Sequence, residues 1–258
     1  MNLYFVDSFT DKLFSGNPAG VLITSEWLPD KLMQSIASEN NLAETAFVVP
    51  DASDFGIRWF TPVAEVDLCG HATLASAYVM FNELGYAKKT IHFNSKSGIL
   101  SVTKDGEWLT LDFPADTLHT VELTPGLQKT TNANILEAYQ GRSDYLLVLP
   151  DEKAVHDSHI NLAAIRQLKG RGVIITAEGS DVDCVSRFFA PSIGVDEDPV
   201  TGSAHTSLTP YWAGRLGKNT LTARQLSARG GFLKCTLQGE RVLMSGQAVM
   251  YMKGEIKI

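Results

Sequence analysis

The sequence predicts an α+β protein built from two similar lobes. An aromatic strand segment closed by proline at 58–62 recurs at 187–191, an offset of 187 − 58 = 129 residues. Gly70-His71-Ala72 recurs as Gly202-Ser203-Ala204, an offset of 202 − 70 = 132. Much of the remaining chain alternates in strand fashion. The shared order of strand, proline, loop, glycine and helix indicates a duplication, with three extra residues in the second loop.

Each repeat contains a helix that is almost free of charge. No Asp, Glu, Lys or Arg occurs at 68–82 or at 201–214, so each helix should be buried nearly all round. A buried helix start leaves backbone N–H groups without intrahelical partners and concentrates positive potential there. Two such starts predict one cleft in which backbone donors from both halves hold a small anion. The alternative is that glycine and alanine only let these helices pack closely.

The first half reads as strands interrupted by two helices. Alternating patterns predict strands at 2–9, 21–23, 45–49, 57–60, 90–94, 98–104 and 108–113, the last two joined by a hairpin turn at Asp105-Gly106. Apolar residues at helical spacing predict a helix at about 28–38, with Ser25 as its cap and Pro29 in its first turn. Residues 15–20 read as a turn.

The second half begins after a polar, turn-rich segment at 114–126, which predicts lobes at 1–115 and 116–258 with the last strand able to return to the first lobe. Patterns predict helices at 133–139 and 161–169, and strands at 145–149, 172–176, 183–189, 229–237 and 241–250. Pro210 lies inside the second uncharged helix and should kink or divide it.

The composition excludes several classes of protein. The chain has 258 residues, of which 44% are hydrophobic and 20% charged, as in an ordinary globular protein. No apolar run reaches membrane-spanning length and no basic, then apolar, leader is present, so we expect a cytoplasmic protein without a membrane partner. The net charge of −7 gives no basic surface for nucleic acid. Three widely spaced cysteines predict neither a disulfide framework nor a metal site, and no nucleotide-binding glycine motif occurs.

Several residues stand where chemistry is plausible, each with a structural alternative. Glu44 precedes an apolar strand and is a candidate buried acid or base, although most such glutamates are solvated. Cys69 precedes the first uncharged helix, whose N-terminus should lower the pKa of the thiol. It is either a nucleophile or acid/base group, or only a small buried side chain. His71, in the first turn, either contacts a substrate or caps the helix. Asp198 precedes the second helix, where acidic residues are common caps. Asn17 lies in a Gly-Asn-Pro sequence that is either a turn or a set of backbone donors.

Four motifs together resemble the PhzF-like phenazine biosynthesis family. They are Gly16-Asn17-Pro18, Asn41-Leu42-Ala43-Glu44-Thr45-Ala46-Phe47, Cys69-Gly70-His71-Ala72-Thr73 and Glu197-Asp198-Pro199-Val200-Thr201-Gly202-Ser203-Ala204. The resemblance runs from the first strand to Ser245-Gly246-Gln247-Ala248 near the C-terminus. Four motifs in the right order are far more specific than any one of them.

The resemblance implies the diaminopimelate epimerase-like fold, in which each of two pseudo-symmetric lobes wraps a curved, mainly antiparallel or mixed sheet around a central helix. It also implies an active site between the lobes, a homodimer, no cofactor and no metal. The family's best understood member isomerises a dihydro-hydroxyanthranilic acid by moving a proton between ring carbons. The expected function is therefore a cofactor-independent isomerase acting on a small unsaturated cyclic or amino carboxylic acid.

Carried over by motif, the family's acid/base glutamate falls on Glu44, its histidine on His71 and its aspartate on Asp198. The backbone donors for the substrate fall on Gly70, His71, Gly202 and Ser203, and we add Asn17 as a binding residue. Where the family often has serine before the glutamate, this chain has Ala43. That difference puts the dihydro-hydroxyanthranilate substrate in doubt, though not the proton transfer.

Two other functions compete with this one. Epimerases of the same fold use a thiol at each helix start, but the counterpart of Cys69 here is Thr201, which disfavours a two-thiol racemase. A variant in which Cys69 works with another base remains. The chain could also be a small-acid-binding protein without turnover, although the presence of Glu44, His71 and Asp198 argues against a degenerate site.

Overall fold

A computed structural model of the protein describes residues 1–52 and 54–258. The chain forms two compact units: unit 1 comprises Met1–Asp112 and Ser245–Ile258, and unit 2 comprises Phe113–Met244. The C-terminal segment thus returns to unit 1. Throughout the part of the chain that the structure describes, no helix is both long enough and apolar enough to span a membrane.

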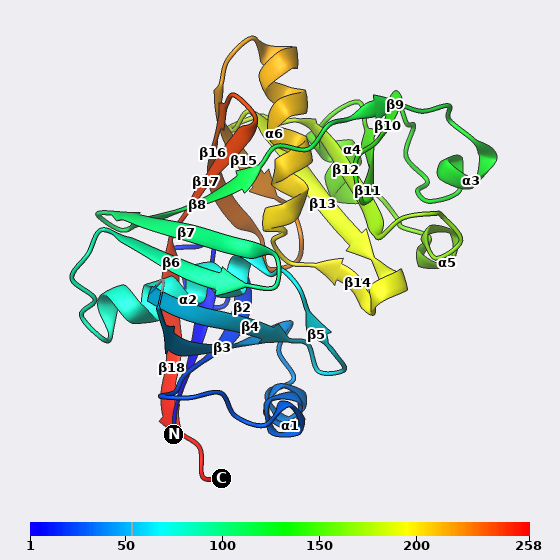
Figure 1. Ribbon diagram of the computed structural model, residues 1–258. Coiled ribbons are helices and arrows are strands. Elements are labelled where there is room, and N and C mark those ends of the chain that lie inside the picture. The colour runs from blue at the N-terminus through cyan, green and yellow to red at the C-terminus, as the bar shows by residue number, and fades with distance from the viewer. Residues whose placement is uncertain (53) are drawn as a thin grey trace. The chain divides into compact units, whose positions relative to one another are not determined.

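Unit 1 is a sheet with two helices (Figure 1). Its strands are β1 (Asn2–Ser8), β2 (Asn17–Ile23), β3 (Glu44–Asp51), β4 (Asp54–Phe60), β5 (Glu65–Val66), β6 (Thr90–Ser95), β7 (Gly98–Asp105), β8 (Trp108–Pro114) and β18 (Ala248–Glu255). Neighbours in the sheet run β18-β1-β2-β3-β4-β6-β7-β8, and β5 also pairs with β4. The pairs β2–β3 and β4–β6 are parallel, and the others are antiparallel.

The helix α2 (Gly70–Asn82) is the centre of unit 1. It packs against β1, β2, β3, β7 and β18, so the sheet surrounds it on several sides (Figure 1). Alanines along the helix let the strands approach, and the larger Leu74, Val79 and Met80 fill the remaining space. Burying each of those three side chains contributes about 1.5–3 kcal/mol. The uncharged sequence is therefore explained by burial, as predicted.

The other helix of unit 1, α1 (Asp30–Asn40), packs on β3 and β4 through Met33 and Ile36. It begins two residues later than expected, with Pro29 as its N-cap, and Ser25 does not cap it. It ends at Asn41, which adopts the left-handed conformation that asparagine tolerates (φ 48°).

Unit 2 has the same plan. Its strands are β9 (His119–Thr120), β10 (Glu137–Gln140), β11 (Asp144–Val148), β12 (Gly172–Glu178), β13 (Cys184–Ala190), β14 (Val195–Asp198), β15 (Thr220–Gln225), β16 (Gly231–Gln238) and β17 (Arg241–Gly246). Its helices are α3 (Pro125–Gln128), α4 (Glu152–Asp157), α5 (Leu162–Ile165), the 3-10 helix η1 (Pro191–Ile193) and α6 (Gly202–Leu216). Neighbours run β9-β10-β11-β12-β13-β15-β16 with β14 on β13, and α6 packs against β11, β15 and β16.

The strand register confirms the duplication and aligns the two units residue by residue. Thr45 faces Phe60 across β3–β4, and Val173 faces Phe189 across β12–β13. Both β2–β3 and β11–β12 are parallel, and both β4–β6 and β13–β15 are parallel. In this alignment the counterpart of Glu44 is Gly172.

A second repeated feature is an arginine clamp. Arg58 donates from Nε and Nη2 to both carboxylate oxygens of Glu65, at 2.7 and 2.9 Å. Arg187 binds Glu197 in the same bidentate way, at 2.8 and 3.0 Å. The arginines lie 129 residues apart but the glutamates 197 − 65 = 132, so the three extra residues fall between them, where η1 forms.

Some predictions for single elements were wrong. Residues 133–139 do not form a helix, because Glu137–Gln140 pairs as β10 between β9 and β11. The helix predicted at 161–169 shortens to α5, while α4 and β15 were missed. Residue 17 belongs to β2 rather than to a turn, since Asn17 pairs with Ser8 of β1.

Pro210 does not divide α6, which continues from Gly202 to Leu216. Proline lacks the N–H that would bond to the carbonyl four residues earlier, which here is Thr206. That carbonyl instead accepts a hydrogen bond from the backbone N–H of Asp116 at 3.0 Å. The carboxylate of Asp116 also accepts from the hydroxyl of Ser207 at 2.9 Å. Asp116 therefore compensates for the backbone hydrogen bond that Pro210 cannot make.

Candidate functional site

Unit 1 brings three of the candidate residues together at the start of α2. Glu44 is the first residue of β3, Cys69 is the N-cap of α2 and His71 lies in its first turn. The Oε2 atom of Glu44 lies 3.2 Å from Nε2 of His71, and both side chains are largely buried. The thiol of Cys69 lies 3.6 Å from Nδ1 of the same imidazole. Glu44 is distant in the sequence from Cys69 and His71, so the sequence alone did not predict that all three meet at one imidazole.

The neighbours of His71 favour its protonated form. Burial by itself lowers the pKa of the imidazole, but the neighbouring Cys69 and Glu44 outweigh burial and raise that pKa well above its ordinary value. The imidazolium can donate from Nε2 to Glu44, which fixes one carboxylate oxygen. Among the described residues, no hydrogen bond to the other oxygen, Oε1, is present.

The expectation that the helix start lowers the pKa of Cys69 was wrong. Burial, and next the charge of Glu44, raise the pKa of the thiol to about 11. A thiol with such a pKa is almost fully protonated at neutral pH, so it is a poor base and a poor nucleophile.

The backbone around Glu44 and His71 is held by polar contacts. The amide of Asn40 donates to the hydroxyl of Thr45, the residue after Glu44, at 3.1 Å. The hydroxyl of Ser8 donates to the carbonyl of His71 at 2.8 Å. Asn17 is fully buried and pairs across β1–β2 with Ser8, the residue whose hydroxyl contacts His71.

Gly16 explains why the Gly-Asn-Pro motif begins with glycine. Its φ is +67°, and a Cβ there would lie 2.2 Å from the carbonyl oxygen of Ser8. No other residue fits. The motif therefore shapes the β1–β2 connection next to the strand that contacts His71.

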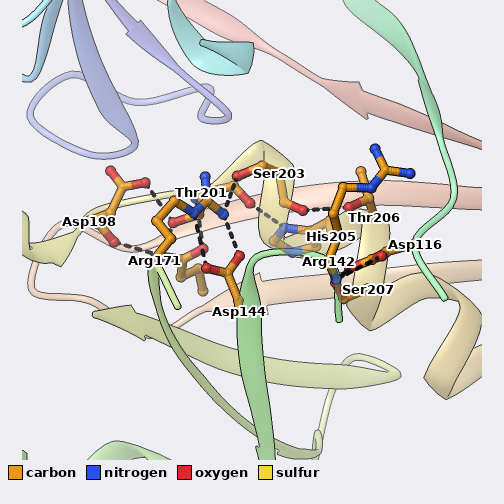
Figure 2. A network of polar contacts seen from close by, with 11 residues as sticks. Asp116, Arg142, Asp144, Arg171, Asp198, Thr201, Ser203, His205, Thr206 and Ser207 are labelled. Atoms are coloured by element: carbon orange, nitrogen blue, oxygen red, sulfur yellow. Dashed lines mark hydrogen bonds and ion pairs between the residues drawn. The ribbon is translucent and has the colours of Figure 1, made fainter. Parts of the chain in front are cut away.

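Unit 2 contains a second polar cluster, at the start of α6 (Figure 2). The hydroxyl of Thr201, the N-cap of α6, donates to the carboxylate of Asp198 at 2.6 Å. The backbone N–H of Thr201 donates to Oε1 of Gln225 at 2.8 Å, and Nε2 of Gln225 donates to the carbonyl of Asp198 at 2.7 Å. Asp198 therefore orients Thr201, the N-cap residue of α6.

Arg171 is a member of this cluster that sequence reasoning missed. It pairs with Asp144 through Nε at 3.0 Å and through Nη2, and Nη2 also donates to the hydroxyl of Ser203 at 2.9 Å (Figure 2). The guanidinium lies over the ring of Phe188, 5.0 Å from its centroid. Burial lowers the pKa of Arg171, but the contact with Asp144 more than offsets it. The cation thus lies directly beside the first turn of α6.

His205 is another residue that the sequence did not single out. Its Nδ1 donates to the carbonyl of Thr201 at 2.8 Å, because a carbonyl can only accept. Burial lowers the pKa of this imidazole to about 4, so it is neutral. Within the described residues its Nε2 has no hydrogen-bond partner. In the repeat, the equivalent position is Thr73, whose hydroxyl likewise donates to the carbonyl of Cys69.

Both helix starts lack a side-chain cap. Among the described residues, neither N-cap side chain, Cys69 or Thr201, makes a regular capping hydrogen bond, although the backbone N–H of Ala72 approaches the thiol of Cys69, and no acidic residue lies in either first turn. The first-turn N–H groups, at Gly70 and His71 in unit 1 and at Gly202 and Ser203 in unit 2, are therefore available to an anion. The structure thus groups Glu44, His71 and Gly70 in one unit, and Asp198, Gly202 and Ser203 in the other.

The repeat is asymmetric at the position of the candidate base. Gly172, the counterpart of Glu44, has no room for a side chain: a Cβ there would lie 2.5 Å from the carbonyl oxygen of Phe189 and 2.8 Å from the ring of Phe188. The counterpart of Cys69 is Thr201, an alcohol. Acid/base groups therefore occur at these paired positions in unit 1 alone.

Comparison with known proteins finds relatives that match the chain over nearly its whole length. The family model described as phenazine biosynthesis-like protein matches residues 6–254. An uncharacterized isomerase of Pseudomonas aeruginosa is 47% identical over 258 residues, covering 100% of this chain and 99% of the relative. The crystal structure of a PhzF family protein from Enterococcus faecalis superposes with a TM-score of 0.97 at 47% identity, covering 100% of this chain and 99% of that one.

A more distant structure shows the fold alone. A predicted epimerase from Pseudomonas aeruginosa, 18% identical, has a TM-score of 0.76 and covers 99% of this chain and 98% of its own. The predicted diaminopimelate epimerase-like fold is thereby confirmed, with a mixed sheet and a buried central helix in each unit. With the family model spanning nearly all of the sequence and close relatives matching end to end, the chain belongs to the phenazine biosynthesis-like (PhzF) family.

Proposed function

We propose that this PhzF family isomerase moves a proton between two carbon atoms of a small unsaturated cyclic or amino carboxylic acid, without a cofactor. Glu44 acts as the single acid and base. The observation that carries the proposal is the position of Glu44, 3.2 Å from His71 at the start of α2, while the equivalent position in the repeat is Gly172. A single carboxylate must then both remove the proton and return it.

The contact with His71 suits this role. The imidazolium donates to one oxygen of Glu44 and so fixes the orientation of the carboxylate. The second oxygen is then free to take a proton from carbon. The positive charge of His71 also stabilises negative charge that develops on the substrate as the proton leaves. General acid/base catalysis of this kind contributes roughly 10²–10⁴-fold to a rate.

The uncapped helix starts are proposed to bind the acid portion of the substrate. Backbone N–H groups at Gly70, His71, Gly202 and Ser203 suit a carboxylate, as does the adjacent cation of Arg171. Asp198 holds Thr201 at the start of α6 and so shapes the unit 2 donors. Asn17 is buried, so its proposed contribution to substrate binding is indirect: it pairs with Ser8 of β1 and does not offer solvent-exposed donors.

An epimerase that uses Cys69 is the competing mechanism, and two observations weaken it. The pKa of the thiol is raised to about 11, which leaves little thiolate at neutral pH. The opposing thiol that such enzymes need is replaced by Thr201, whose hydroxyl is engaged with Asp198. Glu44 is the better base on both counts.

Hydrogen exchange with solvent tests whether the protein turns over a substrate. The purified chain is incubated in heavy water with a panel of small unsaturated cyclic acids and amino acids, and deuterium at carbon is followed by NMR. Binding of each compound is measured in parallel by calorimetry. We expect at least one bound acid to gain deuterium at a carbon position. Binding without exchange across the panel would leave a small-acid-binding protein without turnover.

The homodimer implied by the family resemblance is also proposed for this chain. Sedimentation equilibrium measures it directly, and a monomeric mass at micromolar concentration would contradict it.

A further inference from the structure

The cluster at the start of α2 has the geometry of a metal site as well as that of an acid/base site. One ligand atom from each of Glu44, Cys69 and His71 lies within 4.8 Å of the other two. The nitrogen and carboxylate oxygen are 3.2 Å apart, and the sulfur lies 3.9 Å from the same nitrogen. In a tetrahedral zinc site, with bonds of about 2.0–2.3 Å, ligand atoms lie roughly 3.3–3.6 Å apart.

The donor set points to zinc and not to a harder cation. A thiolate, an imidazole and a carboxylate are the ligands that Zn²⁺ takes in proteins, whereas Mg²⁺ and Ca²⁺ prefer oxygen atoms alone. Three protein ligands leave the fourth position of a tetrahedral ion for water. Zinc binding releases one proton from the Cys69 thiol and one from the His71 imidazolium to solvent. The resulting thiolate and the carboxylate together neutralise the divalent ion, so the filled site carries no net charge.

The ligands lie on fixed parts of unit 1. Glu44 begins β3, and Cys69 and His71 flank the first residue of α2, which is packed on several strands. Cys69 and His71 are both nearly inaccessible to solvent, so the ligands lie in a buried site where a bound ion is shielded from water. Among the described residues this is the single group of three such ligands; the buried cysteines of unit 2, Cys184 and Cys235, belong to none.

We infer that Glu44, Cys69 and His71 form a zinc-binding site, and that zinc bound there reversibly blocks isomerisation. Ligation through one oxygen places the divalent cation on the carboxylate and makes it a much weaker base, so Glu44 no longer takes a proton from carbon. The binding half of this inference stands on the geometry of the three ligands alone. The inhibition half rests on the proposed function of Glu44.

Metal binding is measured first, without reference to activity. The metal-free chain, kept reduced with a phosphine, competes with a chromogenic chelator for Zn²⁺. We expect one zinc ion per wild-type chain. Cys69→Ala and Glu44→Gln should each weaken binding at least about 10-fold, since even changes around a ligand cost that much. Cys184→Ala, which removes a buried thiol of unit 2, is the matched control and should bind as the wild type does.

Cobalt binding gives a second measurement of the site, and its signal distinguishes a lost ligand from a general loss of protein stability. Co²⁺ added to the wild type and to Cys184→Ala should produce a thiolate-to-metal absorption band, and Cys69→Ala should lack it. Zinc should also raise the melting temperature of the wild type and not that of Cys69→Ala. Equal zinc affinity in wild type, Cys69→Ala and Glu44→Gln would overturn the site.

The inhibition is then tested with an acid found to exchange deuterium. Zinc should abolish exchange by the wild type at the concentration that fills the site, and a chelator should restore it. With each protein compared to its own zinc-free rate, Cys69→Ala should need at least about 10-fold more zinc than the wild type for half-inhibition. Zinc bound at the three ligands with exchange unchanged would refute the inhibition and count against Glu44 as the base, while leaving the metal site intact.

Discussion

At the scale of single residues, the two halves of the duplication differ most at Glu44 and Gly172. Both open a parallel strand at the same register, but one carries a carboxylate and the other has no space for a side chain. The space is filled by the ring of Phe188, on which Arg171 lies. Unit 2 therefore has no carboxylate at the position of Glu44, and it has the packed cation of Arg171 beside α6.

Replacing Gly172 by alanine tests this packing. The new Cβ would meet a backbone oxygen that cannot move aside, so we expect Gly172→Ala to lower the free energy of unfolding by about 1–3 kcal/mol in urea titrations. Gly214, inside α6, meets nothing within 4 Å and serves as the control. Gly214→Ala should raise stability by about 0.5–1 kcal/mol. Equal effects of the two substitutions would show that the close contact at Gly172 is not real.

The candidate residues in motifs could be found from the sequence, but their partners could not. Glu44, His71 and Asp198 were identified from the family motifs, and their roles stay predictions. Arg171 lies just before β12 and Gln225 is the last residue of β15; neither stands in a recognisable motif, and only the fold brings them to the start of α6. The pKa of Cys69 was mispredicted because position at a helix start is visible in a sequence, whereas complete burial beside a carboxylate is not.

At the scale of elements, the two arginine clamps tie each short strand before a buried helix to the strand that precedes it. Arg58 joins β4 to Glu65 of β5, and Arg187 joins β13 to Glu197 of β14. Each guanidinium also lies over a ring two residues along its own strand, Phe60 or Phe189. The clamps therefore fix the loops that lead into α2 and α6.

The first clamp should make stability depend on pH in a defined window. The hydrogen bonds from Arg58 lower the pKa of Glu65 from 4.5 to about 2, so the folded chain keeps this charge at a pH where the unfolded chain has lost it. The stabilisation is complete above pH 4.5 and disappears as the pH falls through about 2. Glu65→Gln should cost about 1 kcal/mol near neutral pH, limited by solvent screening.

Urea titrations over this window measure the effect. The difference between wild type and Glu65→Gln should shrink steadily below pH 4.5, whereas the exposed Glu122→Gln should show no such trend. A difference that stays constant down to about pH 3 would mean that the clamp carries no linked stability.

Elements with strong patterns were predicted well, and those decided by distant contacts were not. The hairpin of β7 and β8 and the two uncharged helices appear where expected. Residues 133–139 have a helical pattern, but pairing with two neighbouring strands makes part of them β10. The uninterrupted course of α6 past Pro210 depends on the N–H of Asp116, nearly a hundred residues earlier, which no local pattern reveals.

At the scale of the whole molecule, the chain closes unit 1 with its last strand. β18 pairs antiparallel with β1 from Asn2 to Ser8, and the chain's N-terminal amine donates to the carbonyl of Ile256. Unit 1 is therefore assembled from two separate segments of the sequence, whereas unit 2 is one continuous segment.

Truncation tests this dependence. A chain ending at Met244 lacks β18, so we expect the amides of β1 to lose hydrogen-exchange protection while strands of unit 2 such as β12 keep theirs. A chain lacking only the exposed Lys257 and Ile258 is the control and should match the full protein. Unchanged protection of β1 in the longer truncation would contradict the described pairing.

The central claim is that Glu44 alone removes and returns the proton, and two substitutions measured on one substrate test it most directly. With an acid that exchanges deuterium, kcat/KM is compared for wild type, Glu44→Gln and Cys69→Ala. We predict a loss of roughly 10²–10⁴-fold for Glu44→Gln and a change of less than about 10-fold for Cys69→Ala. An inactive Cys69→Ala protein beside an active Glu44→Gln protein would contradict the account.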